Sequence, residues 1–168
     1  MPGTQVVMET SLGPITVALA DEQAPATVAN FLGYVDDHFY DGTVFHRVIP
    51  NFMIQGGGFE PGLKQKRTKP AIKNESANGL SNTRGTLAMA RTNVADSATA
   101  QFYVNVKDND FLDKAKAEDR VGYCVFGKVV EGMDVVDKIK AVKTTTKGGH
   151  GDVPVTDVVI TSVRREAK

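Results

Sequence analysis

The chain has 168 residues, with 20 basic and 20 acidic side chains and a formal net charge of zero at pH 7. This length suits one domain, since single cores split only beyond about 250 residues, and we expect residues 1–168 to form it. The balanced charge argues against a nucleic-acid binder, which needs a basic excess to neutralise phosphates.

The start of the sequence carries no recognisable targeting signal. Residues 1–5 lack the basic segment and the apolar run of a secretory signal peptide. No stretch approaches the ~18 consecutive apolar residues that a membrane helix needs. The single cysteine, Cys124, cannot form an internal disulfide, which suits a reducing compartment. The sequence therefore predicts a cytoplasmic protein that binds no membrane.

The first elements in chain order are β-strands. Val6–Thr10 and Pro14–Leu19 are β-like runs, and a turn containing Gly13 separates them. This pattern predicts an opening hairpin.

Two later segments have the pattern of helices. The first places four apolar side chains on one stripe, at Val28, Phe31, Leu32 and Val35. Pro25 suits the first turn of this helix, where its missing N–H costs nothing. The second helix is expected at about Met133–Ala141, with Asp134 near its start and Lys138 near its end, as the helix dipole favours.

Six further runs have β character. They are Val44–Ile49, Phe52–Gln55, Gly85–Ala90, Gln101–Val106, Cys124–Val130 and Val155–Val163. Many short strands separated by Gly, Pro and Asn predict a sandwich or a barrel. Two helices are too few to cover both faces of a parallel sheet, so we expect a mainly β fold, an antiparallel barrel with helices at its open ends. The runs Gly56-Gly57-Gly58 and Gly148-Gly149 lack the context of a phosphate loop and are interpreted as turns.

The usual signatures of metal or covalent chemistry are missing from the sequence. The histidines at positions 38, 46 and 150 do not have the spacing of a zinc site, and no nucleophile elbow is present. Cys124 lies in an apolar run, which favours a buried, unreactive thiol. A basic cluster is interpreted as a solvated loop; it comprises Lys64, Lys66, Arg67, Lys69 and Lys73. We therefore expect no metal and no cofactor.

Two segments combine apolar and polar residues in a way that suggests a groove. Arg47 and Gln55 lie within the strongly apolar run 44–57. By itself, an arginine in a strand is usually a rim residue that pairs with a carboxylate. By the strand period of two, Gln101–Val106 has a core face of Phe102, Val104 and Val106 and an opposite face of Gln101, Tyr103 and Asn105. An apolar surface with a few polar donors is typical of a peptide-binding site.

These motifs resemble those of the cyclophilin-type peptidyl-prolyl cis/trans isomerases. The resemblance is carried by Phe45-His46-Arg47, Phe52-Met53-x-Gln55-Gly56-Gly57, Gly85–Ala90, Ala100–Tyr103, Cys124–Val129 and Gly132–Val136. The resemblance spans nearly the whole chain, and the sequence looks most like the short bacterial branch of the family. The resemblance implies a closed eight-stranded antiparallel barrel capped by two α-helices. It also implies an enzyme that accelerates rotation about Xaa-Pro bonds in folding proteins.

The resemblance also implies roles for individual residues. Arg47 would be the catalytic arginine, and Gln55 would act with it by holding the substrate. The implied substrate-binding residues are Phe52, Met53, Ala90, Arg91, Thr92, Gln101, Tyr103, Phe111, Leu112 and Tyr123. Of these, the pocket for the proline ring would use Phe52, Met53, Tyr103 and Leu112. The backbone of residues 90–92 would pair with an extended peptide, and Phe111 and Tyr123 would stand at the rim.

Five positions depart from the family pattern. Tyr103 replaces the usual phenylalanine, which predicts a more polar pocket floor, and Tyr123 replaces a common histidine. Arg91-Thr92 replaces the commoner Asn-Ala, which could alter the preference beside the proline. Phe111 replaces a common tryptophan and cannot donate an indole N–H, so we expect weak cyclosporin binding. His46 neighbours Arg47, and we favour a structural role for it.

Two other functions remain open from the sequence. The chain could be a module that binds proline-containing peptides with negligible turnover, although a pure binder gains little from Arg47. It could also be a structural subunit, although the sequence shows no obvious docking helix. The favoured partners are proline-containing peptides and unfolded or folding proteins, bound by a monomer.

Overall fold

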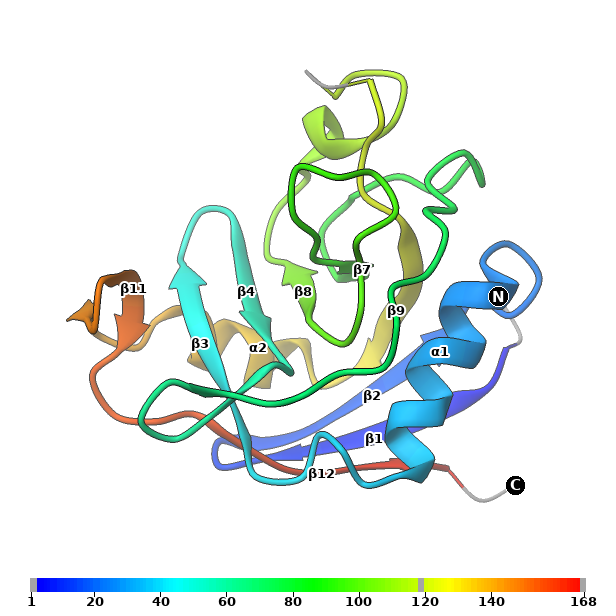
Figure 1. Ribbon diagram of the computed structural model, residues 1–168. Helices are drawn as coiled ribbons and strands as arrows, with labels where there is room; N and C mark the ends of the chain where they lie inside the picture. Colours follow the sequence, from blue (N-terminus) through cyan, green and yellow to red (C-terminus); the bar gives the residue numbers. More distant parts are fainter. Residues whose placement is uncertain (1–2, 118–119, 167–168) are drawn as a thin grey trace.

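The computed structural model describes residues 3–117 and 120–166, and eight of its strands close into an antiparallel barrel (Figure 1). The barrel strands are β1 (Gln5–Thr10), β2 (Gly13–Leu19), β3 (Thr43–Ile49), β4 (Met53–Gly56), β7 (Thr86–Met89), β8 (Phe102–Asn105), β9 (Val125–Glu131) and β12 (Val159–Arg165). Their order around the barrel is β1-β12-β3-β4-β8-β7-β9-β2. The predicted barrel is confirmed, while the predicted domain limits 1 and 168 lie outside the described residues.

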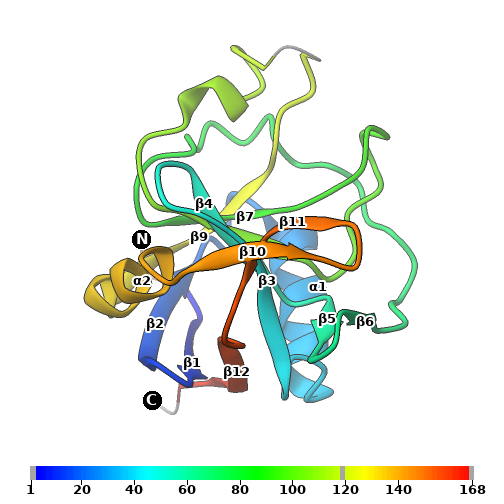
Figure 2. The same ribbon diagram turned by 90° about the vertical axis from the view of Figure 1, so that its left-hand side faces the viewer.

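Two helices pack against the barrel, on opposite sides of it in Figure 2. Helix α1 spans Pro25–Asp36 and α2 spans Met133–Lys140, which confirms both predicted helices, the second to within a residue of its predicted ends. All four predicted stripe residues of α1 are buried. Phe31 of this stripe meets Phe102 of β8 edge to face, with 5.8 Å between ring centroids. From α2, Val136 and Ile139 are fully buried in the same core.

The start of α1 is capped from a distant part of the chain. Ala24 precedes the helix and offers no side-chain cap. The Glu75 carboxylate instead accepts hydrogen bonds from the Thr27 N–H and the Thr27 hydroxyl, both at 2.7 Å. A carboxylate at this end also complements the helix dipole. Glu75 therefore stabilises the helix and ties its own loop segment to the start of α1.

Four short strands lie outside the barrel and were not predicted. They are β5 (Phe59–Glu60), β6 (Lys64–Gln65), β10 (Thr144–Lys147) and β11 (His150–Pro154). Gly148 and Gly149 form the β10–β11 turn with φ values of 52° and 81°, which confirms a turn there. The prediction of a strand over Val155–Val163 is wrong in its first half, because β11 ends at Pro154 and β12 begins only at Val159.

The faces of β8 follow the predicted alternation. Phe102 and Val104 point into the main core, while Tyr103 belongs to a second apolar cluster with Met53 and Val125. This second cluster lies on the outer face of strands β4, β8, β7 and β9, and it supports the site described next. Over the described residues, no helix has the length and apolar character needed to cross a membrane.

Candidate functional site

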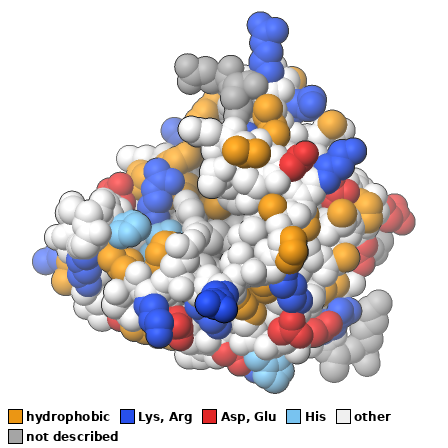
Figure 3. All heavy atoms as spheres, in the orientation of Figure 1, with side chains coloured by type: hydrophobic (Ala, Val, Ile, Leu, Met, Phe, Trp, Pro, Cys, Tyr) orange, Lys and Arg blue, Asp and Glu red, His pale blue; other side chains and the backbone are white. Residues whose placement is uncertain are grey.

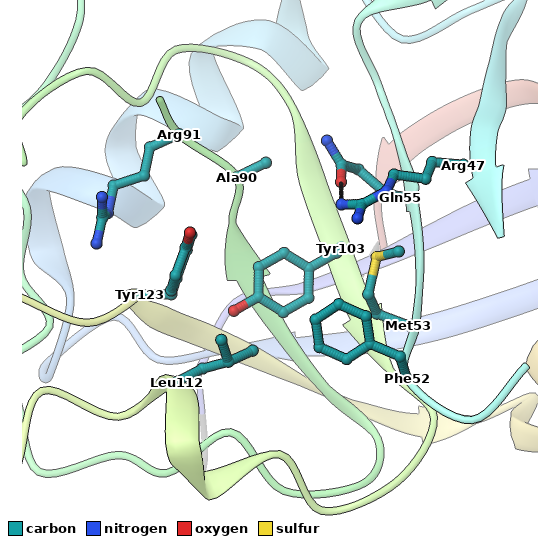
Figure 4. A pocket seen from close by; sticks show the side chains of 9 residues that line it. All are labelled: Arg47, Phe52, Met53, Gln55, Ala90, Arg91, Tyr103, Leu112 and Tyr123. Atoms are coloured by element: carbon teal, nitrogen blue, oxygen red, sulfur yellow. Dashed lines mark hydrogen bonds between the residues drawn. The ribbon is translucent and has the colours of Figure 1, made fainter. Parts of the chain in front are cut away.

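A pocket of about 130 Å³ opens on the outer face of the barrel over β4, β7 and β8 (Figure 4). Its lining comprises Arg47, Phe52, Met53, Gln55, Ala90, Arg91, Tyr103, Leu112 and Tyr123. Drug-sized ligands usually occupy pockets of roughly 300–1,000 Å³, so this pocket suits one small apolar group. The structure thus brings together nine of the twelve residues expected at the site.

A β-bulge turns Arg47 toward this pocket. In the pairing of β3 with β4, Phe45 lies opposite Gly56 and Arg47 lies opposite Gln55. Two steps along β3 therefore match one step along β4, and His46 is the extra residue. Phe45 points into the main core, so strict alternation would also turn Arg47 inward. The bulge instead puts Arg47 on the outer face beside Gln55.

A chain of polar side chains holds the guanidinium in place (Figure 4). Arg47 Nη1 donates to Gln55 Oε1 at 3.3 Å, and Gln55 Nε2 donates to Gln101 Oε1 at 3.0 Å. Gly58 makes room for this arrangement, because a Cβ there would come within 2.4 Å of the Gln101 side chain. Among the described residues, Arg47 has no ion pair with an acidic side chain. Its charge therefore faces the pocket without a carboxylate partner.

The pocket floor is the ring of Tyr103, which is 4% exposed. Its hydroxyl donates to Asn82 Oδ1 at 2.8 Å, and burial raises the pKa of the Tyr103 phenol well above its usual value. The hydroxyl is thus neutral and already paired. We expected this tyrosine to make the floor more polar, but the paired hydroxyl leaves mainly the ring to act as the floor.

One wall is built from Tyr123 and Arg91. The Arg91 guanidinium lies over the Tyr123 ring, 4.3 Å from its centroid, in a cation–π contact. Arg91 also donates from Nη2 to the carbonyl oxygen of Gly122 at 2.8 Å. In Figure 4 these two side chains lie on the side of Tyr103 away from Arg47. Arg91 is therefore fixed to the wall by two kinds of contact.

Three expected site residues lie beside the pocket and do not line it. Gln101 supports Gln55, as described above. Phe111 is 51% exposed and stacks on Phe52 with 5.9 Å between centroids. The Thr92 N–H donates to Ser97 Oγ at 3.0 Å, and the Ala90 N–H donates to the Gln101 carbonyl at 3.0 Å. Pairing of residues 90–92 with a peptide would have to use their other backbone groups.

Comparison with known proteins identifies the family. The sequence model described as "Cyclophilin type peptidyl-prolyl cis-trans isomerase/CLD" matches residues 5–165. The chain belongs to this family. It is 60% identical over 159 residues to peptidyl-prolyl cis-trans isomerase B of Escherichia coli (strain K12), covering 94% of this chain and 97% of that one. It is 57% identical over 164 residues to a peptidyl-prolyl cis-trans isomerase of Acinetobacter baylyi, covering 98% and 86%.

Solved cyclophilins share the fold of this chain. A Cryptosporidium parvum cyclophilin type peptidyl-prolyl cis-trans isomerase, solved in the presence of dipeptide Ala-Pro, aligns with a TM-score of 0.83 at 23% identity and covers 98% of this chain and 99% of that one. A cyclophilin from Hirschia baltica aligns with a TM-score of 0.76 at 25% identity, covering 97% and 74%. The predicted family, the bacterial likeness and the class of enzyme are confirmed: this cyclophilin is a peptidyl-prolyl cis-trans isomerase.

One residue of this cyclophilin lies on the predicted face of β8, together with Tyr103, but is not exposed there. Asn105 was expected on an open polar face with Gln101 and Tyr103, but it is fully buried. Its Nδ2 donates to Thr86 Oγ1 at 3.0 Å and to Asn82 Oδ1 at 3.1 Å. The apolar surface around the pocket therefore covers a buried polar cluster, which the sequence reasoning missed. No spacing signal reveals it, because Asn105 lies 19 positions from Thr86 and 23 positions from Asn82 along the chain.

His46 and Cys124 are buried near the site without lining the pocket. His46 packs against Phe59 with 4.4 Å between ring centroids, and its Nδ1 has no hydrogen-bond partner among the described residues. Burial lowers its pKa from 6.5 to about 4, with repulsion from His150 and Arg47 as smaller causes. Burial also raises the pKa of the Cys124 thiol, so the thiolate is disfavoured at neutral pH.

Proposed function

We propose that this isomerase acts by directing the Arg47 guanidinium at the nitrogen of a half-rotated Xaa-Pro imide whose proline ring occupies the pocket. The observation that carries the proposal is a guanidinium that lines an apolar pocket and lacks an acidic partner among the described residues. A guanidinium keeps its charge over the working pH range.

The reaction needs no bond to break, which suits this set of residues. Amide resonance gives a rotational barrier of about 18–20 kcal/mol, while the cis and trans Xaa-Pro forms differ by only about 0.5–1 kcal/mol. When the bond twists, the nitrogen becomes pyramidal and its lone pair localises. A donor directed at this lone pair stabilises the transition state more than either planar form, which is the condition for catalysis.

The neighbouring residues would divide the remaining tasks. Phe52, Met53 and Leu112 surround the Tyr103 ring and would hold the proline ring away from water, which strengthens the field of the nearby cation. Gln55 would hold Arg47 and the peptide on one side of the rotating bond while the other side turns. The site would therefore supply one positive charge, held in place at Arg47, and one apolar pocket for the proline ring.

The decisive test is the Arg47→Ala variant in a protease-coupled assay of a short Xaa-Pro peptide. By analogy with the loss of one oxyanion donor, kcat/KM should fall roughly 10²–10³-fold while the fold is kept. Arg67→Ala, which removes an exposed arginine, is the matched control and should retain activity. Because no titrating group is invoked, the rate of the wild type should stay flat from about pH 6 to 8.

Two results would overturn this mechanism. One is near-wild-type turnover by folded Arg47→Ala. The other is a bell-shaped pH profile near neutrality, which would assign the chemistry to a titrating group. The same assay addresses the rival function of a peptide-binding module, since such a module would bind the peptide without accelerating its isomerisation.

Further features of the proposal come from the sequence and from relatives. We infer that the substrates are proline-containing segments of peptides and of unfolded or folding proteins. A relative of the same fold was solved with an Ala-Pro dipeptide, and the pocket here suits one proline ring. Weak cyclosporin binding, a monomeric state and a cytoplasmic location stay predictions of the sequence.

A further inference from the structure

Three buried asparagine side chains lie around the floor of the pocket. Asn82, Asn105 and Asn109 are all 0% exposed. Asn105 ends β8, Asn82 lies in the loop before β7, and Asn109 lies in the loop after β8. Burying an amide is costly unless its polar atoms are hydrogen-bonded. The partners of these side chains therefore show what the cluster holds in place.

The side chain of Asn82 uses its full hydrogen-bonding capacity. Its Nδ2 donates to Asp113 Oδ1 at 2.9 Å and to the carbonyl oxygen of Tyr123 at 3.4 Å. Its Oδ1 accepts from the Tyr103 hydroxyl at 2.8 Å and from Asn105 Nδ2 at 3.1 Å. Because a carboxylate and a backbone carbonyl can only accept, these partners fix which way the amide points.

The backbone of Asn82 extends the same set of contacts. Its N–H donates to Asp113 Oδ1 at 2.7 Å, and its carbonyl accepts the Asn109 N–H at 2.7 Å. Asn109 Nδ2 in turn donates to the carbonyl oxygen of Phe52 at 2.8 Å and to Asn105 Oδ1 at 2.8 Å. The contacts that begin at Asn82 thus reach the opposite wall of the pocket.

We propose that Asn82 is a positioning residue that sets the shape of the pocket for the proline ring. It bonds directly to the Tyr103 hydroxyl, to the Tyr123 backbone and to the side chain of Asp113, the residue that follows Leu112. Tyr103 comes from β8, Tyr123 from the segment before β9 and Leu112 from the 3-10 turn Asp110–Leu112. These three pocket residues surround one space in Figure 4. The inference rests on the proposed role of this pocket.

The expected effect of losing Asn82 is on recognition more than on the chemical step. Without its amide, the Tyr103 hydroxyl and the Asp113 carboxylate lose their shared partner, and the floor and two walls can shift. Arg47 and Gln55 lie on β3 and β4 and, within the described part of the chain, share no hydrogen bond with Asn82, so the proposed donor stays in place. KM should therefore rise about fivefold or more, while kcat should change by no more than about threefold.

The test measures the selectivity for ring size with two peptides, one containing Xaa-Pro and one containing Xaa-pipecolyl, whose ring has one more methylene. One methylene in an apolar pocket changes kcat/KM by about 10–200-fold. We expect Asn82→Ala to lower the proline preference of the wild type by about fivefold or more. The matched control is Asn78→Ala, which removes a bond to the Val125 carbonyl at 3.0 Å and should keep the preference unchanged.

A second variant decides the matter if Asn82→Ala does not fold. Tyr103→Phe removes one bond to Asn82 and keeps the aromatic ring, and we expect it to lower the proline preference by about twofold. Unchanged preference in every folded variant would overturn the inference.

A substitution in the pocket itself distinguishes failure of the positioning role of Asn82 from failure of the proposed function. If Met53→Ala leaves kcat/KM unchanged, the pocket is not the substrate site and the proposed function is wrong. If Met53→Ala impairs activity while the ring preference stays constant in Asn82→Ala and Tyr103→Phe, only the positioning role is wrong.

Discussion

Replacing His46 by phenylalanine should remove part of the acid sensitivity of the folded state. His46 is 6% exposed, and its ring packs against Phe59 with 4.4 Å between centroids. Its Nδ1 is buried without a hydrogen-bond partner in residues 3–117 and 120–166, so a proton there gains no acceptor from them. Burial, helped by repulsion from His150 and Arg47, lowers the pKa of His46 from 6.5 to about 4.

The direction and size of the effect follow from this shift. Between the two pKa values, the unfolded chain binds a proton at position 46 that the folded chain does not bind. The stabilisation is therefore complete above the unfolded pKa of 6.5 and is lost as the pH falls toward about 4. One pKa unit corresponds to about 1.36 kcal/mol. Relative to pH 7, the protonation of His46 on unfolding should therefore lower the free energy of unfolding by about 2 kcal/mol at pH 5 and about 3 kcal/mol at pH 4.

The assay is urea unfolding at pH 7 and pH 5 for the wild type and His46→Phe. Ion pairs with arginine lower the pKa of Asp41 and Asp36, so these carboxylates titrate below this window. Between pH 7 and pH 5, we expect the free energy of unfolding to fall by about 2 kcal/mol more in the wild type than in His46→Phe. His38→Asn, which removes an exposed histidine, should behave like the wild type. An equal loss in the wild type and His46→Phe would refute the reasoning.

Two further predictions concern the helix cap and the pocket rim. Glu75→Ala removes the acceptor for the Thr27 N–H and hydroxyl and should lower the free energy of unfolding by about 1–2 kcal/mol, measured by urea unfolding. The exposed Glu22→Ala is the control, and equal stability of the two variants would contradict the capping role. Phe111→Trp places an indole N–H at the half-exposed rim and should tighten cyclosporin inhibition about fivefold in an inhibitor titration. The same inhibition in wild type, Phe111→Trp and Phe111→Leu would exclude such a bond.

Regular elements could be predicted because burial imposes a period on the sequence. The α1 stripe contains Phe31, and burial on one side of the helix repeats every three to four residues. In β8, Phe102 and Val104 face the barrel core while Tyr103 faces outward, as the period of two requires. The hairpin β10–β11 has no such signal, because its first strand is Thr144-Thr145-Thr146-Lys147 and only its turn glycines are distinctive.

The site itself depends on features that no period encodes. Arg47 reaches the outer face only because His46 is an extra residue in the β3–β4 pairing, and alternation along the sequence would predict the opposite face. Asn82 and Asp113 lie 31 positions apart, so their contact exists only in the folded barrel. From sequence alone, Asn82 is one more polar residue in a loop. The family resemblance supplied Arg47 and the pocket residues, but not the residues beneath them.

Arg47 is held by the neutral amide of Gln55 and not by a carboxylate of the described residues, and this choice of partner affects its proposed catalytic role. A carboxylate would fix the guanidinium firmly, but it would also neutralise the charge and occupy the N–H groups that the proposed mechanism directs at the imide nitrogen. Gln55 provides a neutral acceptor at 3.3 Å, longer than the usual 2.9–3.0 Å of a strong bond, and Gln101 orients that amide in turn. A weak bond to a neutral acceptor orients the guanidinium and leaves its N–H groups able to bind the substrate. Replacing Gln55 by glutamate should therefore damage the proposed mechanism more than replacing it by alanine, because an ion pair would compete with the substrate for Arg47.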